Sequence, residues 1–192
     1  MTRLLRYLSH PQVVIDADVP VGRWPLNAEG HARLVAIGDR AWLGRVTRIV
    51  SSTETKAMET AAVLVQALDL TAEIRKDFHE NDRSATGFLP PEEFERVADA
   101  FFAEPDLSVR GWETARAAQA RIVRATEEVL AGHSTGDLLI VGHGAVGALL
   151  WCHLADRPIS RSEDQRPGGG CVWTFDLDSG LPVHPWRPVE EI

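Results

Sequence analysis

The sequence predicts an α/β fold of three layers, α/β/α, in which helices cover both faces of a mostly parallel sheet. Short apolar runs alternate along the chain with longer segments whose apolar residues recur at helical spacing. The most apolar run, DLLIV at 137–141, lacks polar alternation and is typical of a strand buried on both faces. Because 192 residues with 44% hydrophobic side chains can form a full core, we expect residues 1–192 to be a single domain.

The expected strands are short apolar runs that end at polar residues. They cover 3–8, 47–50, 71–74, 137–141 and 171–177. The expected helices are amphipathic, and two have recognisable starts: Asn27 as an N-cap, and proline in the first turn after residue 89. They cover 28–42, 53–68, a segment from 90 onward, 112–131 and 145–154, and a Pro-rich tail closes the chain. Ligands of such folds bind beyond the carboxyl ends of the strands, which draws attention to the loops after three of these strands.

Composition and charge indicate an intracellular protein that binds neither nucleic acid nor membranes. The chain carries 20 basic and 28 acidic residues, a net charge of -8, whereas nucleic acids and anionic membranes attract basic surfaces. No apolar stretch is long enough to span a bilayer, and the N-terminus lacks a signal-peptide pattern. The only two cysteines, Cys152 and Cys171, lie in apolar contexts and are expected to be reduced, so we expect a cytoplasmic location.

The stretch LIVGHGAVG at 139–147 places a histidine inside a glycine-rich turn between an expected strand and an expected helix. Gly142, Gly144 and Gly147 have the spacing of a dinucleotide-binding turn. Such a turn normally opens a nucleotide-binding unit and is followed by an acidic residue at the next strand end, and neither condition holds here. We therefore interpret the turn as one that directs His143 toward a ligand, with the glycine spacing incidental.

A second histidine, His10, directly follows the first expected strand. Two histidines at the carboxyl ends of two strands are able to face one pocket, one as a nucleophile toward phosphorus and the other as a stabiliser of the transferred group. Lys56 and Glu80 occur where phosphoryl transfer would use a cation and a proton donor. The residues therefore favour phosphoryl chemistry over dinucleotide binding.

At this point the sequence resembles the histidine phosphatase superfamily, the phosphoglycerate mutase-like clan. The resemblance runs from residue 3 to about 150 and consists of landmarks in family order. An apolar strand is followed by Ser-His-Pro in place of the family's Arg-His-Gly, and the family's Pro-Leu-spacer-Gly has its counterpart in PLNAEG. SSTETKAMETA at 51–61 has the place of the family's Ser-Ser, Arg-Ala and Gln-Thr-Ala, FHE at 78–80 that of its general acid, and His143-Gly144 that of its second histidine.

The resemblance implies a phosphoglycerate mutase-like fold and a phosphatase that uses neither metal nor cofactor. His10 would attack phosphorus and form a phosphohistidine, and His143 would stabilise the charge of the transferred group. Glu80 would protonate the leaving oxygen and then deprotonate the attacking water. Gly144 would lie against the bound phosphate.

The sequence departs from the family pattern where arginines normally grip the phosphate. Ser9 precedes the nucleophile in place of one arginine, and Lys56 replaces a second, so both are expected to bind substrate with a weaker grip. Pro11 in place of glycine removes a backbone donor. We expect another cation to compensate, with Arg23 the first candidate and Arg83 the second.

Two hypotheses follow. In the first, the chain hydrolyses a phosphomonoester, or a phosphohistidine, through a phosphohistidine intermediate on His10. In the second, it is a catalytically weak or inactive relative that binds a phosphorylated ligand or a protein partner. Residues 81–110 are expected to form a short lid that sets substrate choice. The substrate, whether small molecule or phosphoprotein, and the oligomeric state stay open.

Overall fold

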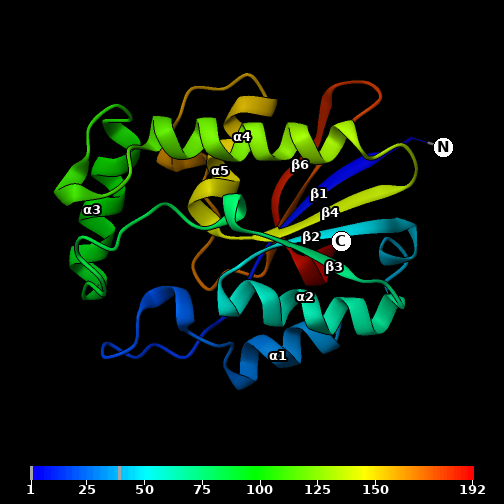
Figure 1. The fold of residues 1–192 in the computed structure, drawn as a ribbon, viewed down its shortest axis with the longest axis horizontal. Coiled ribbons are helices and arrows are strands. Elements are labelled where there is room, and N and C mark those ends of the chain that lie inside the picture. The colour runs from blue at the N-terminus through cyan, green and yellow to red at the C-terminus, as the bar shows by residue number, and fades with distance from the viewer. Residues whose placement is uncertain (1, 39) are drawn as a thin grey trace.

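Six strands form one mixed sheet in the computed structural model, which describes residues 2–38 and 40–192 (Figure 1). The strands are β1 (Leu4–Ser9), β2 (Val46–Ser52), β3 (Ala72–Arg75), β4 (Asp137–Gly142), β5 (Cys171–Asp176) and β6 (Leu181–Pro188). Their order is β3-β2-β4-β1-β5-β6. The first four strands run parallel to one another, and β5 and β6 are antiparallel. The carboxyl ends of β1, β2 and β4 therefore meet at one edge of the sheet.

Helices cover both faces, as the alternation of patterns predicts. The helices are α1 (Ala28–Val35), α2 (Thr55–Leu68), α3 (Pro91–Ala103), α4 (Ala115–Ala131) and α5 (Gly144–Leu154). Figure 1 shows α1 and α2 below the sheet, α4 and α5 above it, and α3 at one end of the molecule. Short 3-10 helices complete the described chain at Val21–Arg23, Leu43–Arg45, Lys76–Phe78, Val109–Gly111, Arg161–Glu163 and Val189–Glu191.

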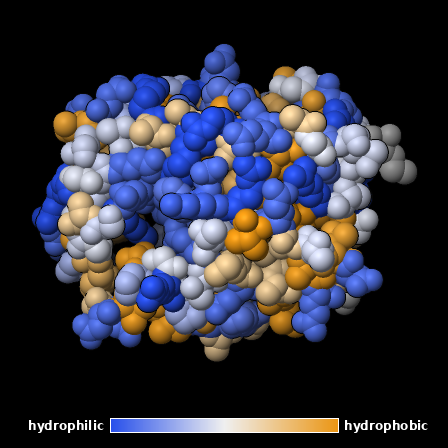
Figure 2. Space-filling view, viewed as in Figure 1, coloured by the Kyte–Doolittle hydropathy of each residue, from blue (hydrophilic) through white to orange (hydrophobic). Residues whose placement is uncertain are grey.

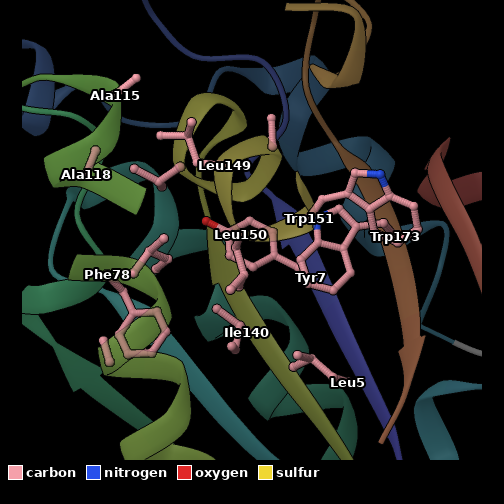
Figure 3. Close-up of a cluster of buried hydrophobic side chains, with 14 of the residues drawn as sticks. Leu5, Tyr7, Phe78, Ala115, Ala118, Ile140, Leu149, Leu150, Trp151 and Trp173 are labelled. Carbon is pink, nitrogen blue, oxygen red and sulfur yellow. The ribbon is translucent and has the colours of Figure 1, made fainter. Parts of the chain in front are cut away.

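The central strand β4 divides the core into two parts. Leu138 and Ile140 belong to the cluster under α4 and α5, whereas Leu139 and Val141 belong to the cluster over α1 and α2. All four are fully buried, and each such side chain contributes roughly 1.5–3 kcal/mol by leaving water. The upper cluster contains the large rings, and Figure 3 shows Tyr7 lying against Trp173, with ring centroids 5.3 Å apart. Burial on both faces confirms the prediction made from the DLLIV run.

Two elements differ from the sequence prediction. Helix α1 ends at Val35, not at residue 42, because Gly38 follows in a turn whose N–H bonds to the Val35 carbonyl. Ile37 and Trp42 continue the apolar pattern of the helix beyond its end, because both side chains pack into the core although neither residue is helical. The expected tail contains β6, whose prolines obscured its strand character; an edge strand tolerates proline because its outward N–H groups need no partner.

Candidate active site

The two histidines singled out by the sequence lie together at the carboxyl edge of the sheet. His10 follows β1 and His143 follows β4, and these strands are hydrogen-bonded neighbours in which Ser9 is in register with Gly142. The His10 N–H donates to the Gly142 carbonyl at 3.0 Å, which ties the two strand ends together. The imidazole centroids are 5.4 Å apart, with the rings at 69°. The predicted pairing across one site is therefore present in the fold.

The His10 ring is held in one tautomer. Its Nδ1 lies 2.8 Å from the carbonyl oxygen of Pro11. A carbonyl only accepts, so Nδ1 carries the proton and Nε2 keeps a free lone pair. Burial, together with the charge of Lys56, lowers the pKa of His10 to about 4, so the ring is neutral near pH 7. A neutral imidazole with a free Nε2 is the form that is able to act as a nucleophile.

His143 is completely buried beside this ring. Its backbone N–H donates to the Tyr7 hydroxyl at 3.0 Å, and its Nε2 lies 2.8 Å from the Ser52 hydroxyl oxygen. Burial holds its pKa well below the ordinary value. Within residues 2–38 and 40–192 its Nδ1 has no hydrogen-bond partner, and the same is true of Nδ2 of the buried Asn81. Unsatisfied buried polar atoms are rare in native proteins, and Asn81 is one of the residues that line the His10 cavity, where a ligand rich in oxygen would be able to satisfy it.

The glycines around His143 are required by packing. A Cβ on Gly142 would collide with the Tyr7 hydroxyl, and one on Gly147 would collide with Tyr7 and Trp186. A Cβ on Gly144 would collide with the side-chain amide of Gln165. Close approaches of side chains to these three positions therefore account for the G-x-G-x-x-G spacing. No dinucleotide is needed to explain the glycines.

The Glu80 side chain contacts the first turn of α5, the helix that follows His143. Its carboxylate accepts hydrogen bonds from the N–H groups of Ala145 and Val146, at 3.4 and 3.1 Å. Free N–H groups at a helix start favour a negative partner. Its own N–H donates to Glu54 Oε1 at 2.9 Å. These contacts fix the carboxyl group of Glu80 on the wall of the cavity that His10 also lines.

Lys56 is buried at the start of α2, and its charge already has a partner. Its Nζ donates to the Val21 carbonyl at 2.8 Å and lies 2.5 Å from Glu54 Oε2. Only 3% of the Lys56 side chain is exposed. Two of its three N–H groups are therefore used within the protein, in a position where the sequence predicts a phosphate-binding cation.

Ser9, which takes the place of an arginine, is also turned toward the protein. Its hydroxyl donates to the side-chain oxygen of Gln165 and accepts from the Cys171 N–H at 3.1 Å. Ser9 is fully buried and does not line the cavity, whereas Gln165 and Gly144 do. Ser9 was predicted to bind substrate, but Gln165 lies between its hydroxyl and the cavity, whose lining includes Gln165.

Arg83, rather than Arg23, lines the cavities. Arg23 is exposed on the 3-10 helix Val21–Arg23 and lines none of the cavities described here, so its predicted role is wrong in geometry. Arg83 lies at the junction of the cavities, with its guanidinium 5.0 Å from the ring centre of Phe94. Arg166 lines the same cavity as His10. Neither Arg83 nor Arg166 forms an ion pair with any part of the chain that the structure describes.

The His10 cavity has a volume of about 390 Å³ and adjoins a second of about 750 Å³. Glu80, Asn81 and Arg83 line both. One wall of the first consists of α3, which lies in the expected 81–110 segment, and Asp164 also lines this cavity. In Figure 2 a dark hollow bordered mostly by hydrophilic side chains opens near the α3 end of the molecule. Burial raises the pKa of Asp164 to about 6, so this carboxyl holds a proton in weakly acidic solution.

Sequence reasoning missed three of the residues that shape the site: Glu54, Asp164 and Gln165. Asp164 and Gln165 lie in the irregular segment SRSEDQRPGGG, where no periodicity marks a function. Glu54 precedes α2 and was indistinguishable from an ordinary helix-start carboxylate. Its spacing of two residues from Lys56 was the available signal. Among the described residues, no group of three or more His, Cys, Asp or Glu side chains is arranged to hold a metal ion.

A mixed α/β sheet with two strand-end histidines and a carboxyl group at one cavity defines a class of phosphoryl-transfer folds. The histidine phosphatase superfamily (branch 1) matches residues 18–184. The chain belongs to this superfamily. The matched range begins after His10, so the assignment of that residue depends on the geometry described above.

Solved structures, among them two of phosphatases, share the fold. Mycobacterial glucosyl-3-phosphoglycerate phosphatase superposes with a TM-score of 0.76 at 20% identity, covering 96% of each chain. Bacillus stearothermophilus YhfR gives a TM-score of 0.77 at 20% identity over 95% of each chain. A mutant phosphoserine phosphatase from Entamoeba histolytica, solved with phosphoserine, gives 0.80 at 14% identity over 99% of each chain. A search of curated proteins found no match. At these identities the likeness establishes the fold.

Proposed function

We propose that the chain is a phosphatase that hydrolyses a phosphomonoester, or a phosphohistidine, through a phosphohistidine intermediate on His10. The observation that carries the proposal is the hydrogen bond from His10 Nδ1 to the Pro11 carbonyl, which leaves the Nε2 lone pair free on a neutral ring at the cavity. Superfamily membership and the phosphatases of the same fold support phosphatase chemistry in general.

The reaction proceeds in two displacements. In the first, His10 Nε2 forms a bond to phosphorus as the bond to the leaving oxygen breaks, and Glu80 gives that oxygen a proton. In the second, a water attacks phosphorus and gives its proton to Glu80, while the bond from phosphorus to His10 breaks. The products are an alcohol and inorganic phosphate, and both side chains return to their starting states.

We infer that polar groups at and near the cavity hold the transferred group. The unpartnered Asn81 Nδ2, the His143 ring and the guanidinium groups of Arg83 and Arg166 are the candidate donors. Donors aimed at a phosphoryl oxygen stabilise the charge that it carries in the transition state. A single charge-assisted hydrogen bond contributes about 1.5–3 kcal/mol. Arg83 and Arg166 would therefore offset the loss of the two family arginines that Ser9 and Lys56 replace.

The second hypothesis also has an observation in its favour. Ser9 and Lys56, the two positions where the family has arginines, are both engaged with other residues of the chain, namely Gln165 and Glu54. A site with fewer phosphate contacts would bind a phosphorylated ligand or phosphoprotein partner and turn it over slowly. Binding without turnover is the outcome that distinguishes this relative from an enzyme.

The proposed location is the cytoplasm. Cys152 and Cys171 are free and buried, which fits a reducing compartment. No helix among the described residues has the length and apolarity needed to cross a bilayer.

The first test is hydrolysis of nitrophenyl phosphate by the wild type and by His10→Gln, each followed by a quench in alkaline detergent to trap protein labelled from a radioactive phosphate ester. We expect turnover and an acid-labile, base-stable phosphoenzyme in the wild type, and neither in His10→Gln. Arg23→Gln is the matched control outside the cavity. Turnover that persists in His10→Gln would exclude the phosphohistidine route, and phosphate binding without turnover would favour the second hypothesis.

A further inference from the structure

The Glu54 carboxylate contacts Lys56, His143 and the backbone of Glu80. Its Oε2 pairs with Lys56 Nζ at 2.5 Å, and its Oε1 lies 3.6 Å from His143 Nε2. The same Oε1 accepts the N–H of Glu80 at 2.9 Å. Only 15% of its side chain is exposed, on the wall of the cavity that adjoins the His10 cavity. Glu54 therefore occupies contacts that an anionic ligand would otherwise take.

This carboxylate is ionised in the folded protein. Burial alone would raise its pKa, but the Lys56 ammonium and the Glu80 N–H outweigh burial, and the pKa lies well below its ordinary value. Because Glu54 neutralises Lys56, the cations left for a ligand of the His10 cavity include Arg83 and Arg166, which line it.

The charges around the cavities are close to balance. The titratable and charged groups that surround Glu54 or share its cavity are Lys56, His143, His10, Lys76, His79, Glu80, Asp82 and Arg83. Asp164 lies across the adjoining cavity, where Arg161 pairs with it at 3.5 Å. A second negative charge on a ligand comes close to the fixed carboxylate of Glu54, which repels it.

We propose that Glu54 makes this site selective for a phosphoryl group that carries a single negative charge. The substrate class is then the monoanion of a phosphomonoester, or a phosphodiester, in preference to a phosphomonoester dianion. The proposal rests on the proposed function for the identity of the site, but it concerns binding and does not depend on turnover. Within the described residues no other buried carboxylate contacts both Lys56 and His143.

The test measures anion affinity by calorimetry with inorganic phosphate and with sulfate, at about pH 5 and about pH 8. Phosphate is mostly singly charged at the lower pH and mostly doubly charged at the higher, whereas sulfate is doubly charged at both. Wild-type protein is expected to bind phosphate about tenfold or more tightly at the lower pH, and to bind sulfate weakly throughout. Sulfate also controls for protonation of Asp164, which would affect both anions alike.

Glu54→Gln keeps the acceptor oxygen for Lys56 and Glu80 but removes the charge. It is expected to bind sulfate and doubly charged phosphate about tenfold more tightly than wild type, and to retain affinity for singly charged phosphate. Glu54→Asp retains the charge and should retain the preference. Glu59→Gln is the matched control, because Glu59 lies on α2, the helix that follows Glu54, accepts a hydrogen bond from the Leu26 N–H, and lines neither cavity.

Equal affinity of the wild type for both phosphate forms, after correction by sulfate, would overturn the inference, and so would a failure to bind singly charged phosphate. The wild-type measurement decides this even if Glu54→Gln does not fold. Hydrolysis of nitrophenyl phosphate and of bis-nitrophenyl phosphate at about pH 8 then distinguishes a phosphomonoester substrate from a phosphodiester substrate. Selective binding without hydrolysis of either ester would uphold the inference and reject the proposed function.

Discussion

The Ser9 hydroxyl donates a hydrogen bond to the side-chain oxygen of Gln165, which comes from a segment more than 150 residues further along the chain. Gln165 also packs against Gly144, so one side chain touches the residue before His10 and the residue after His143. The space that an arginine at position 9 would need is therefore filled by Gln165.

Ser9→Arg alone is expected to lower stability by about 1–3 kcal/mol, because a larger side chain enters a filled site. Combined with Gln165→Ser, which vacates that space, it is expected to tighten phosphate binding about tenfold through a charge-assisted hydrogen bond. Thermal denaturation and phosphate titration check both effects, with Gln165→Ser alone as control. A double variant with wild-type phosphate affinity would show that position 9 does not face the phosphate.

Stability is expected to fall as the pH is lowered through the range where the histidines charge in the unfolded chain. His10 has a pKa of about 4 when folded and an ordinary value of 6.5, so the unfolded state takes up its proton first. The contribution of this neutral, buried His10 is complete above pH 6.5 and is lost between there and about 4. The loss is about 3 kcal/mol for this group.

His10→Asn removes that titration and is expected to flatten the dependence of unfolding free energy on pH. Urea denaturation between about pH 4 and 7 measures the slope. His31→Asn is the control, because His31 is exposed on α1. Identical slopes for the wild type and His10→Asn would contradict the depressed pKa of His10.

Asp164→Asn is expected to stabilise the protein in neutral and alkaline solution. Burial raises the folded pKa of Asp164 from 3.8 to about 6, so ionisation costs stability as the pH rises through that interval. The amide, which is neutral at every pH, avoids a cost of about 3 kcal/mol. The gain in melting temperature should be full above pH 6 and vanish near pH 4; a gain that is independent of pH would point to packing instead.

Arg83→Gln is expected to weaken phosphate binding about tenfold or more, since it removes a guanidinium at the junction of both cavities. Arg23→Gln makes the same change of charge on an exposed turn and should leave the affinity within about twofold. Titration of each variant with phosphate compares them directly. Equal losses in the two variants would mean that overall charge, rather than the position of Arg83, attracts the anion.

The positions of His10, Glu80 and His143 were predictable because each follows a strand or turn whose pattern is local. An apolar run that ends at a polar residue reports a strand end, and the carboxyl ends of parallel strands converge. The parallel, two-sided burial of β4 follows from DLLIV for the same reason.

The roles of the cations were not predictable in this way. Whether Arg23 or Arg83 faces the cavity depends on how the loop after β1 and the 81–110 segment pack, which no periodicity records. Lys56 would contact solvent if it were exposed and contacts the Glu54 carboxylate because it is buried, and the sequence pattern does not report this burial. The prolines of β6 obscured a strand because proline is read as a breaker unless the strand is known to lie at an edge.

Those same prolines affect how copies of this chain can meet. Pro182, Pro185 and Pro188 leave three of the eight residues of β6 without an N–H, so this border of the sheet cannot offer a neighbouring molecule an unbroken row of donors. The other border is β3, which is only four residues long. Intermolecular sheet extension, the usual route to fibrillar aggregation, is therefore disfavoured at both borders, and any assembly of this protein would form through side chains.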